Sequence, residues 1–194
     1  MTIINGRACV VNGTPVDKVF SNGRQVYGRN LVLNSADLSN FSTWTANHSK
    51  PTVSADGYEM TIVTKHGGLN IGYLNLSKYL PNIGDTVTIS VEAKGNATLQ
   101  FNYNNGSGFT PGKAMPITAD YKRYSAQFVW NPVAGINQQF VIYTVDSTDT
   151  TLVIKHPQIE ISSVATPWSP APEDVLKGDI TTPKNLVESQ SYIK

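Results

Sequence analysis

The stretch Thr86-Val87-Thr88-Ile89-Ser90-Val91 decides the fold class of this chain. In an extended strand successive side chains point to opposite faces, so Val87, Ile89 and Val91 share one face and the hydroxyl residues share the other. This alternation is typical of an antiparallel strand that packs one face on a core and leaves the other in solvent. It predicts a half-buried strand over residues 85–93.

The same alternation recurs along the chain, whereas the spacing of an amphipathic helix is almost absent. The clearest further strands are predicted at residues 58–64, 97–103, 121–130, 138–145 and 150–161. The turn Lys94-Gly95-Asn96 is expected to return the chain as a hairpin into the strand at 97–103. This pattern predicts an all-β protein, and its length and strand count suit an antiparallel β-sandwich of two sheets, most simply a jelly roll.

The chain of 194 residues is long enough for one domain with additional arms or linkers, and its composition excludes several classes of protein. Only 15% of the residues are charged, against roughly a quarter in an average domain, and the formal net charge is +1. We therefore expect neither nucleic acid nor an anionic membrane as a partner. A single cysteine, Cys9, excludes an intrachain disulfide. Because no long apolar run occurs, we expect neither a secretion signal nor a membrane-spanning segment.

Residues 1–29 are expected to form a small N-terminal arm of β-hairpins. Asn5, Asn12 and Asn22 are each followed by glycine, and Asn-Gly favours the type I′ turn of a two-residue hairpin. Two or three short strands are marginally stable without a partner surface. We therefore expect the arm to dock on another surface.

Residues 163–194 differ in composition from the predicted sandwich at 30–162 and are expected to form an extended, proline-rich linker and a C-terminal tail. Three prolines in the stretch Thr166-Pro-Trp-Ser-Pro-Ala-Pro-Glu-Asp favour extended backbone. The last stretch, 175–194, holds too few apolar side chains for a core of its own. We expect it to continue into, or to pack on, a neighbour.

Three stretches of the sequence are distinctive: Val26-Tyr-Gly-Arg-Asn30, Asn30-Leu-Val-Leu-Asn34-Ser-Ala-Asp, and Pro157-Gln-Ile-Glu160-Ile-Ser-Ser-Val-Ala-Thr-Pro-Trp168-Ser-Pro-Ala-Pro-Glu-Asp. Together they resemble tail and baseplate proteins of phages that infect Gram-positive bacteria, of the lactic-acid-bacteria type, over roughly residues 8–174. The central domain is similar to the galactose-binding-like, carbohydrate-binding jelly rolls that such proteins carry.

The resemblance implies an accessory protein of the virion tail tip or baseplate, made in the host cytoplasm, whose arm attaches it to the virion. Its jelly roll would bind host cell-wall polysaccharide weakly at each site and gain adhesion through many copies. The implied partners are other tail and baseplate proteins, the host saccharide and further copies of the chain. The alternative is a purely structural connector or decoration protein of the virion, because modules of this family also serve as spacers.

A saccharide site needs an aromatic ring for the apolar face of a sugar and amides or carboxylates for its hydroxyl groups. Amides, a serine and one arginine occupy predicted outward strand positions, where an ordinary solvent-facing row would hold more Lys and Glu. The predicted sugar-binding residues are Gln100, Asn102, Phe109, Tyr121, Arg123 and Gln127, with Tyr121 as the preferred stacking ring. Further candidates are Trp44, Tyr58, Tyr73, Tyr103, Tyr143 and Gln139, although a sandwich core also needs large aromatic residues.

A structural calcium ion is the one metal that the resemblance suggests, because such jelly rolls often carry one near the meeting point of their first and last strands. Asn34, Asp37 and Glu160 are the predicted ligands, since calcium takes several oxygen ligands. Alternatively, Asn34 or Asp37 caps a turn through its side chain. No other cofactor is expected.

Because no catalytic constellation is recognisable, we expect a protein without enzymatic activity. No Gly-x-Ser-x-Gly motif occurs, and His48, His66 and His156 lack the spacing of a transition-metal site. A glycoside hydrolase needs two carboxylates across a cleft, and Glu92 and Glu160 are the pair to check. The alternative is that both are strand residues opposite Lys or Arg.

Overall fold

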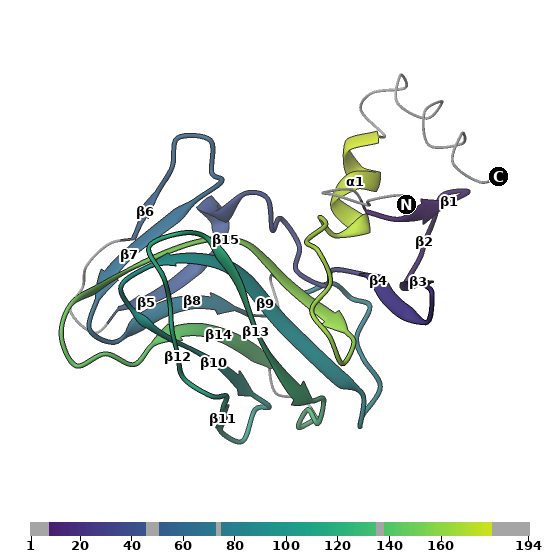
Figure 1. Ribbon diagram of the computed structural model, residues 1–194. Coiled ribbons are helices and arrows are strands. Elements are labelled where there is room, and N and C mark those ends of the chain that lie inside the picture. The colour runs from purple at the N-terminus through teal and green to yellow at the C-terminus, as the bar shows by residue number, and fades with distance from the viewer. Residues whose placement is uncertain (1–7, 46–50, 73–74, 135–137, 180–194) are drawn as a thin grey trace.

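Two antiparallel sheets pack face to face in the computed structural model, which describes residues 8–45, 51–72, 75–134 and 138–179, without the side chains of 42–45 and 177–179 (Figure 1). The six-stranded sheet has the order β11 (Phe109–Pro111), β10 (Thr98–Asn104), β14 (Gln139–Thr144), β8 (Gly67–Ile71) and β5 (Ser42–Thr45), and β12 (Met115–Pro116) also pairs with β10. The five-stranded sheet has the order β13 (Lys122–Val129), β9 (Thr86–Gly95), β15 (Thr150–Ile161), β7 (Met60–Thr64) and β6 (Thr52–Val53). The prediction of an all-β, antiparallel sandwich is confirmed.

The core fills the space between the sheets. Val87, Ile89 and Val91 on β9 are fully buried, as their alternation predicts. Across the core the ring of Tyr103 on β10 stacks on Phe140 and Trp130, with centroids 4.8 and 5.6 Å away. Each large apolar side chain buried in this way contributes roughly 1.5–3 kcal/mol relative to an exposed one.

The connection between β9 and β10 differs from the prediction. β9 pairs with β13 and β15, and β10 pairs with β11, β12 and β14, so the turn at 94–96 passes between the sheets and forms no hairpin. Gly95 makes this crossing possible: its φ is +137°, and a Cβ there would lie 2.0 Å from the carbonyl oxygen of Thr151. The apolar residues of the two strands therefore belong to opposite walls of one core.

The N-terminal arm, residues 8–29, contains two hairpins. β1 (Val10–Val11) pairs with β2 (Thr14–Pro15), and β3 (Lys18–Ser21) pairs with β4 (Arg24–Gly28). Asn12 and Asn22 lead both turns with φ of 50° and 51°, followed by glycines that also have positive φ, as type I′ turns require. The hairpin prediction is confirmed at these two sites, and the third, at Asn5, lies outside the described residues.

The exit segment, residues 163–171, is extended as predicted, but it packs against the five-stranded sheet. Its residues Thr166 and Ser169 are buried. The chain then forms a helix, α1 (Pro172–Asp179), where the sequence predicted extended backbone. Pro172 occupies the first helical position and two acidic residues follow in the first turn, an arrangement that suits a helix N-terminus.

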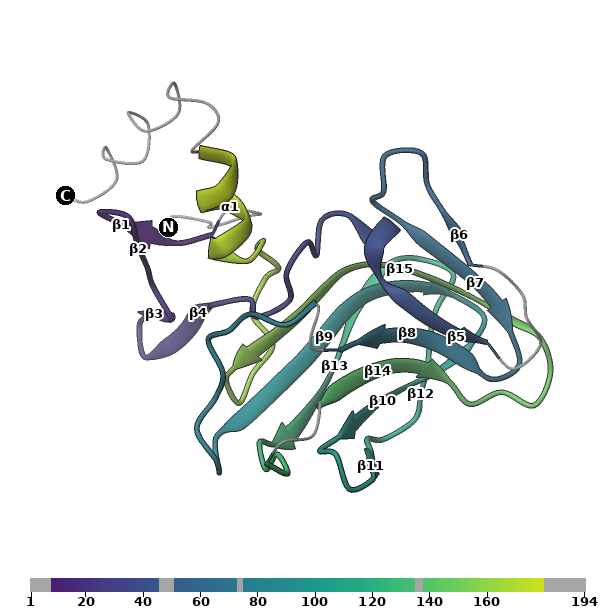
Figure 2. The same ribbon diagram turned by 180° about the vertical axis from the view of Figure 1, so that it is seen from behind.

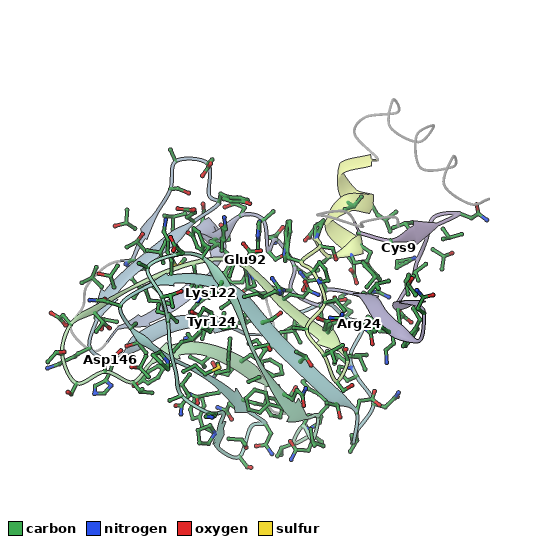
Figure 3. The ribbon with its side chains drawn as sticks, viewed as in Figure 1. Cys9, Arg24, Glu92, Lys122, Tyr124 and Asp146 are labelled. Atoms are coloured by element: carbon green, nitrogen blue, oxygen red, sulfur yellow. The ribbon has the colours of Figure 1, made fainter. Side chains whose placement is uncertain are left out.

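The arm docks on the exit segment and on α1. The Gly28 N–H donates to Thr166 Oγ1 at 3.2 Å, and the Arg29 guanidinium lies 3.2 Å from Asp17 and 2.7 Å from Glu173. Figures 1 and 2 show the arm and α1 together at one end of the sandwich. Figure 3 shows Cys9 and Arg24 in the arm and Asp146 at the opposite end. In the described part of the chain, no helix has the length and apolar character needed to cross a membrane.

Candidate functional site

The six predicted sugar-binding residues lie on opposite sides of the sandwich. On β10, Gln100 and Asn102 alternate with buried core residues and point outward from the six-stranded sheet, next to Phe109 on the edge strand β11. Arg123 and Gln127 belong to β13 of the five-stranded sheet, and Tyr121 directly precedes that strand. The structure therefore divides the predicted set into two faces.

Arg123 and Gln127 are engaged by the chain itself. The Arg123 guanidinium donates to Ser90 Oγ at 2.7 Å and to Gln158 Oε1 at 3.1 Å, and burial lowers its pKa. The Gln127 amide donates to the carbonyl oxygen of Ser163 in the exit segment. A sugar-binding role for these two residues stays a prediction that their contacts do not favour. Sequence reasoning missed these contacts because it took the exit segment for a linker.

The outer face of β8, β10 and β14 carries amides and one aromatic ring. The register places the outward residues in three rows across the sheet: Gly68, Tyr143 and Gln100; Asn70, Val141 and Asn102; and Gln139 and Asn104. Among the described outward positions of these three strands, none holds a charged side chain. We call this surface the amide face. Figure 2 shows its three strands side by side, apart from the arm and α1.

The middle of the amide face is sheltered and polar. Val141 points outward but is only 6% exposed, so its neighbours cover it. The Oδ1 atom of Asn102, which lies opposite Val141, is buried and has no hydrogen-bond partner within the described chain. The Gln100 amide, by contrast, is fixed because it donates to the carbonyl oxygen of Gly112 at 2.9 Å. The face thus presents one oriented amide and one unmet acceptor.

Aromatic rings border this face. The Tyr143 ring stacks on that of His66, with centroids 6.2 Å apart and planes 14° from parallel, and burial raises the pKa of the Tyr143 hydroxyl. At the other edge Phe109 lies opposite Asn104 and is 57% exposed. Aromatic rings can stack on the apolar face of a sugar, while amides bond its hydroxyl groups. The arrangement suits a neutral, hydroxyl-rich ligand.

Similar solved structures include several carbohydrate-binding modules and a phage tailspike protein. The xylan-binding module CBM22-1 of Xyn10C from Paenibacillus barcinonensis superposes with a TM-score of 0.50 and 12% identity, over 70% of this chain and 94% of that one. This chain shares their jelly-roll fold. TmCBM61, solved with β-1,4-galactotriose, gives a TM-score of 0.46 and 10% identity over 70% of this chain and all of that one. A domain of tailspike protein 4 of bacteriophage CBA120 gives 0.46 and 12%, over 69% of this chain and 21% of that one.

Comparison with models of protein families finds no match, and comparison with curated proteins finds none. The superposition on CBM22-1 confirms the similarity to carbohydrate-binding jelly rolls as a similarity of fold. The phage resemblance stays a prediction.

Sequence analysis found part of the amide face. Gln100, Asn102, Phe109, Gln139 and Tyr143 were all candidates, whereas Asn70 and Asn104 were missed. The alternation of residues 67–71 would have revealed Asn70. Tyr103 is 1% exposed and belongs to the core, while Tyr73 and the side chain of Trp44 lie outside the described residues.

The three predicted calcium ligands have separate partners. Asn34 has a positive φ and donates its N–H to Asp174 Oδ2 at 2.7 Å. The Asp37 carboxylate caps a short 3-10 helix (Leu38–Asn40) by accepting from Ser39 N–H at 2.9 Å, and this bond holds its pKa below the usual range.

The third predicted ligand, Glu160, is fully buried and accepts hydrogen bonds from the N–H and hydroxyl of Thr166 at 2.8 and 2.9 Å. The described residues contain no group of three or more His, Cys, Asp and Glu side chains able to hold a metal ion. For Asp37 the structure agrees with the capping alternative, and calcium binding stays a prediction.

The carboxylate pair Glu92 and Glu160 does not fit a glycosidase. Both residues lie on the outer face of the five-stranded sheet, but Glu160 pairs with Thr88, four residues before Glu92 on β9. Four residues of a strand span about 13 Å, beyond the 5–10 Å or so that separates catalytic carboxylates. The general expectation of no enzymatic activity stays a prediction. His48 lies outside the described residues.

Proposed function

We propose that the protein is a saccharide-binding module and that the amide face is its binding surface. The observation that carries the proposal is the sheltered, uncharged row around Asn102, whose buried acceptor lacks a partner. An unmet buried acceptor costs roughly 1–3 kcal/mol, so its persistence is explained by a ligand that supplies a donor. The hydroxyl group of a sugar supplies that donor after a small rotation of the amide.

The ring of Tyr143 and the exposed ring of Phe109 provide apolar contact at the two sides of this row. Because the face holds oriented amides and no charges, the ligand it fits best is a neutral saccharide chain lying across β8, β14 and β10. Carbohydrate-binding modules of the same fold support this function by analogy of architecture alone.

The finer part of the proposal places the module on a phage tail or baseplate, where it binds host cell-wall polysaccharide through many copies. Its support is that two of the stretches carrying the resemblance pack together, through Gly28 with Thr166 and Arg29 with Glu173. A joint built from both ends of the chain suits attachment to a larger particle. The alternative, a structural connector, uses the same joint and no saccharide.

Affinity electrophoresis of the full chain in neutral polysaccharides and in host wall polysaccharide tests the binding site. The double variant Gln100→Ala/Asn102→Ala is expected to bind about tenfold more weakly, since each lost hydrogen bond is worth roughly 0.5–1.5 kcal/mol. The control Asn82→Ala removes an exposed amide beside Asp17 and Arg29, at the arm end of the molecule, and should bind as the parent does. Unchanged binding in the double variant overturns the assignment, and unchanged adsorption of virions carrying it favours the connector.

A further inference from the structure

A second group of aromatic and basic side chains lies on the outer face of the five-stranded sheet. The ammonium groups of Lys155 and Lys94 lie 4.1 and 4.5 Å from the centroid of the Tyr121 ring, and Lys155 also lies 5.3 Å from that of Tyr58. The Tyr121 ring is thus flanked by two cations. We call this surface the basic face.

An open hollow of about 370 Å³ borders the basic face. Its lining residues are Lys94, Gly95, Asn96, Ala119, Thr151 and Val153. The hollow is shallow and open to solvent, and its lining combines apolar surface with the ammonium group of Lys94 at one side. The exit segment contacts this sheet at Trp168, whose ring stacks on His156 with centroids 4.0 Å apart.

The charges around Tyr121 do not cancel. Glu92 lies 3.9 Å from both Arg123 and Lys155, so one carboxylate is shared between two cations. His156 also contacts Glu92, at 3.2 Å, but burial lowers the pKa of its imidazole, so it adds no positive charge at neutral pH. Lys94, which borders the hollow, forms no ion pair within the described chain. Glu59 is a further acid near Tyr121, and its charge adds to burial in raising the pKa of the Tyr121 hydroxyl. The side of the face that meets the hollow is therefore positive.

We propose that the basic face is a second binding site, specific for an anionic sugar residue that carries a carboxylate or a phosphate group. The apolar side of the sugar stacks on the ring of Tyr121, and the ammonium group of Lys94 lies between that ring and the hollow. The ammonium groups of Lys94 and Lys155, on flexible four-carbon stems, swing from the ring to the anion. This site stands on the opposite sheet from the amide face and is independent of the neutral saccharide proposed there.

Isothermal titration of the full chain with two polyanions tests the second site: polygalacturonate supplies carboxylates and poly(glycerol phosphate) supplies phosphates. The double variant Lys94→Gln/Lys155→Gln is expected to bind the preferred polyanion at least about tenfold more weakly. Lys113→Gln, which removes an exposed loop lysine, is the control and should bind as the parent does. Raising NaCl from about 20 to about 500 mM should weaken polyanion binding and leave binding of neutral xylan unchanged.

Each outcome discriminates between the two sites. The second site is overturned if the parent does not bind polyanions, or if the lysine variant binds them as tightly as the parent does. It is also overturned if Gln100→Ala/Asn102→Ala loses polyanion binding. If Gln100→Ala/Asn102→Ala loses xylan binding but keeps polyanion binding, the result bears on the amide face and leaves the second site unaffected. Tyr121→Leu, which keeps an apolar side chain but removes the ring, should also weaken polyanion binding. Thermal unfolding of each variant checks that it is folded.

Discussion

Asn102 and Asn104 are two asparagines on one strand with opposite energetic roles. Both point outward from β10, but Asn104 Oδ1 accepts the N–H of Gly106 at 2.9 Å, while Asn102 Oδ1 is buried without a partner. A satisfied acceptor stabilises the fold and an unmet one opposes it. Stability measurements can therefore separate a residue kept for folding from one kept for binding.

We expect Asn102→Val to raise the free energy of unfolding by about 1 kcal/mol, because it removes an unmet acceptor and packs beside Val141. Asn104→Val should lower it by a similar amount, because it breaks the bond to Gly106. Urea unfolding of both variants checks the signs. If both changes destabilise equally, the unmet acceptor is not a cost to the fold.

The buried carboxylate of Glu160 gives the stability a specific pH dependence. Burial raises its pKa above the ordinary 4.5, outweighing the opposing effects of Thr166, Arg123 and Gln158. A raised pKa in the folded state means that this group's stabilising contribution is complete below about pH 4.5 and is lost as the pH rises through the folded-state value.

Glu160→Gln should remove this dependence. Relative to the variant, the parent is expected to lose stability as the pH increases above about 4.5, which urea unfolding across a pH series measures. The difference between the two proteins isolates Glu160 from the other carboxyl groups. A difference that stays constant with pH contradicts the argument.

At the scale of elements, β8 and β14 approach closely at Gly68. A Cβ on Gly68 would lie 1.8 Å from the carbonyl oxygen of Ile142 and 2.9 Å from Tyr143 Cα. Backbone atoms cannot yield as a flexible side chain does, so this pairing requires glycine. The position of Tyr143 in the face depends on it.

Gly68→Ala is therefore expected to lower the free energy of unfolding by roughly 2–4 kcal/mol. Gly72→Ala, one residue beyond the same strand, meets no atom within 4 Å and should change it by less than about 0.5 kcal/mol. Thermal and urea unfolding of both variants test the contrast. Equal effects would mean that β8 can shift away from β14 at little cost.

The sequence predicted which residues form strands better than which strands pair. The bounds 150–161 agree fully with β15, and the other predicted strands differ by a few residues, because alternation is a local property. Alternation does not show which sheet a strand joins, because that depends on contacts distant in sequence. The predicted hairpin at 94–96 was therefore wrong: β10 joins the other sheet. For the same reason the predicted sugar-binding residues do not form one site: Gln100 and Arg123 both point outward, but from different sheets.

For the whole molecule, the arm is held by polar contacts around Arg29, whose guanidinium also lies 4.1 Å from the centroid of the Tyr79 ring, and by the buried side chain of Tyr27. The core cluster of the sandwich contains none of the described arm residues. Opening of the arm should therefore cost much less free energy than unfolding of the sandwich.

Arg29→Ala is expected to speed amide hydrogen exchange in β3 and β4 by roughly fivefold, because it removes about 1 kcal/mol of contacts with Asp17 and Glu173. Exchange in β9 and β15 should not change. Arg24→Ala, at the exposed start of β4 in the same arm (Figure 3), is the matched control and should leave both rates as they are. Faster exchange throughout the sandwich would mean that arm and body unfold together.

Because β4 enters the sandwich and β15 leaves it at the same end, the molecule has a definite mechanical weak point (Figure 1). We expect tension that draws residues 8 and 179 apart to act first on the contacts of Gly28 with Thr166 and of Arg29 with Glu173, which join the arm to the exit segment and α1. Only then does the load reach β15, which is hydrogen-bonded along both edges, to β7 and β9, and resists shear as a unit. The molecule would thus extend at the joint before either sheet of the sandwich deforms.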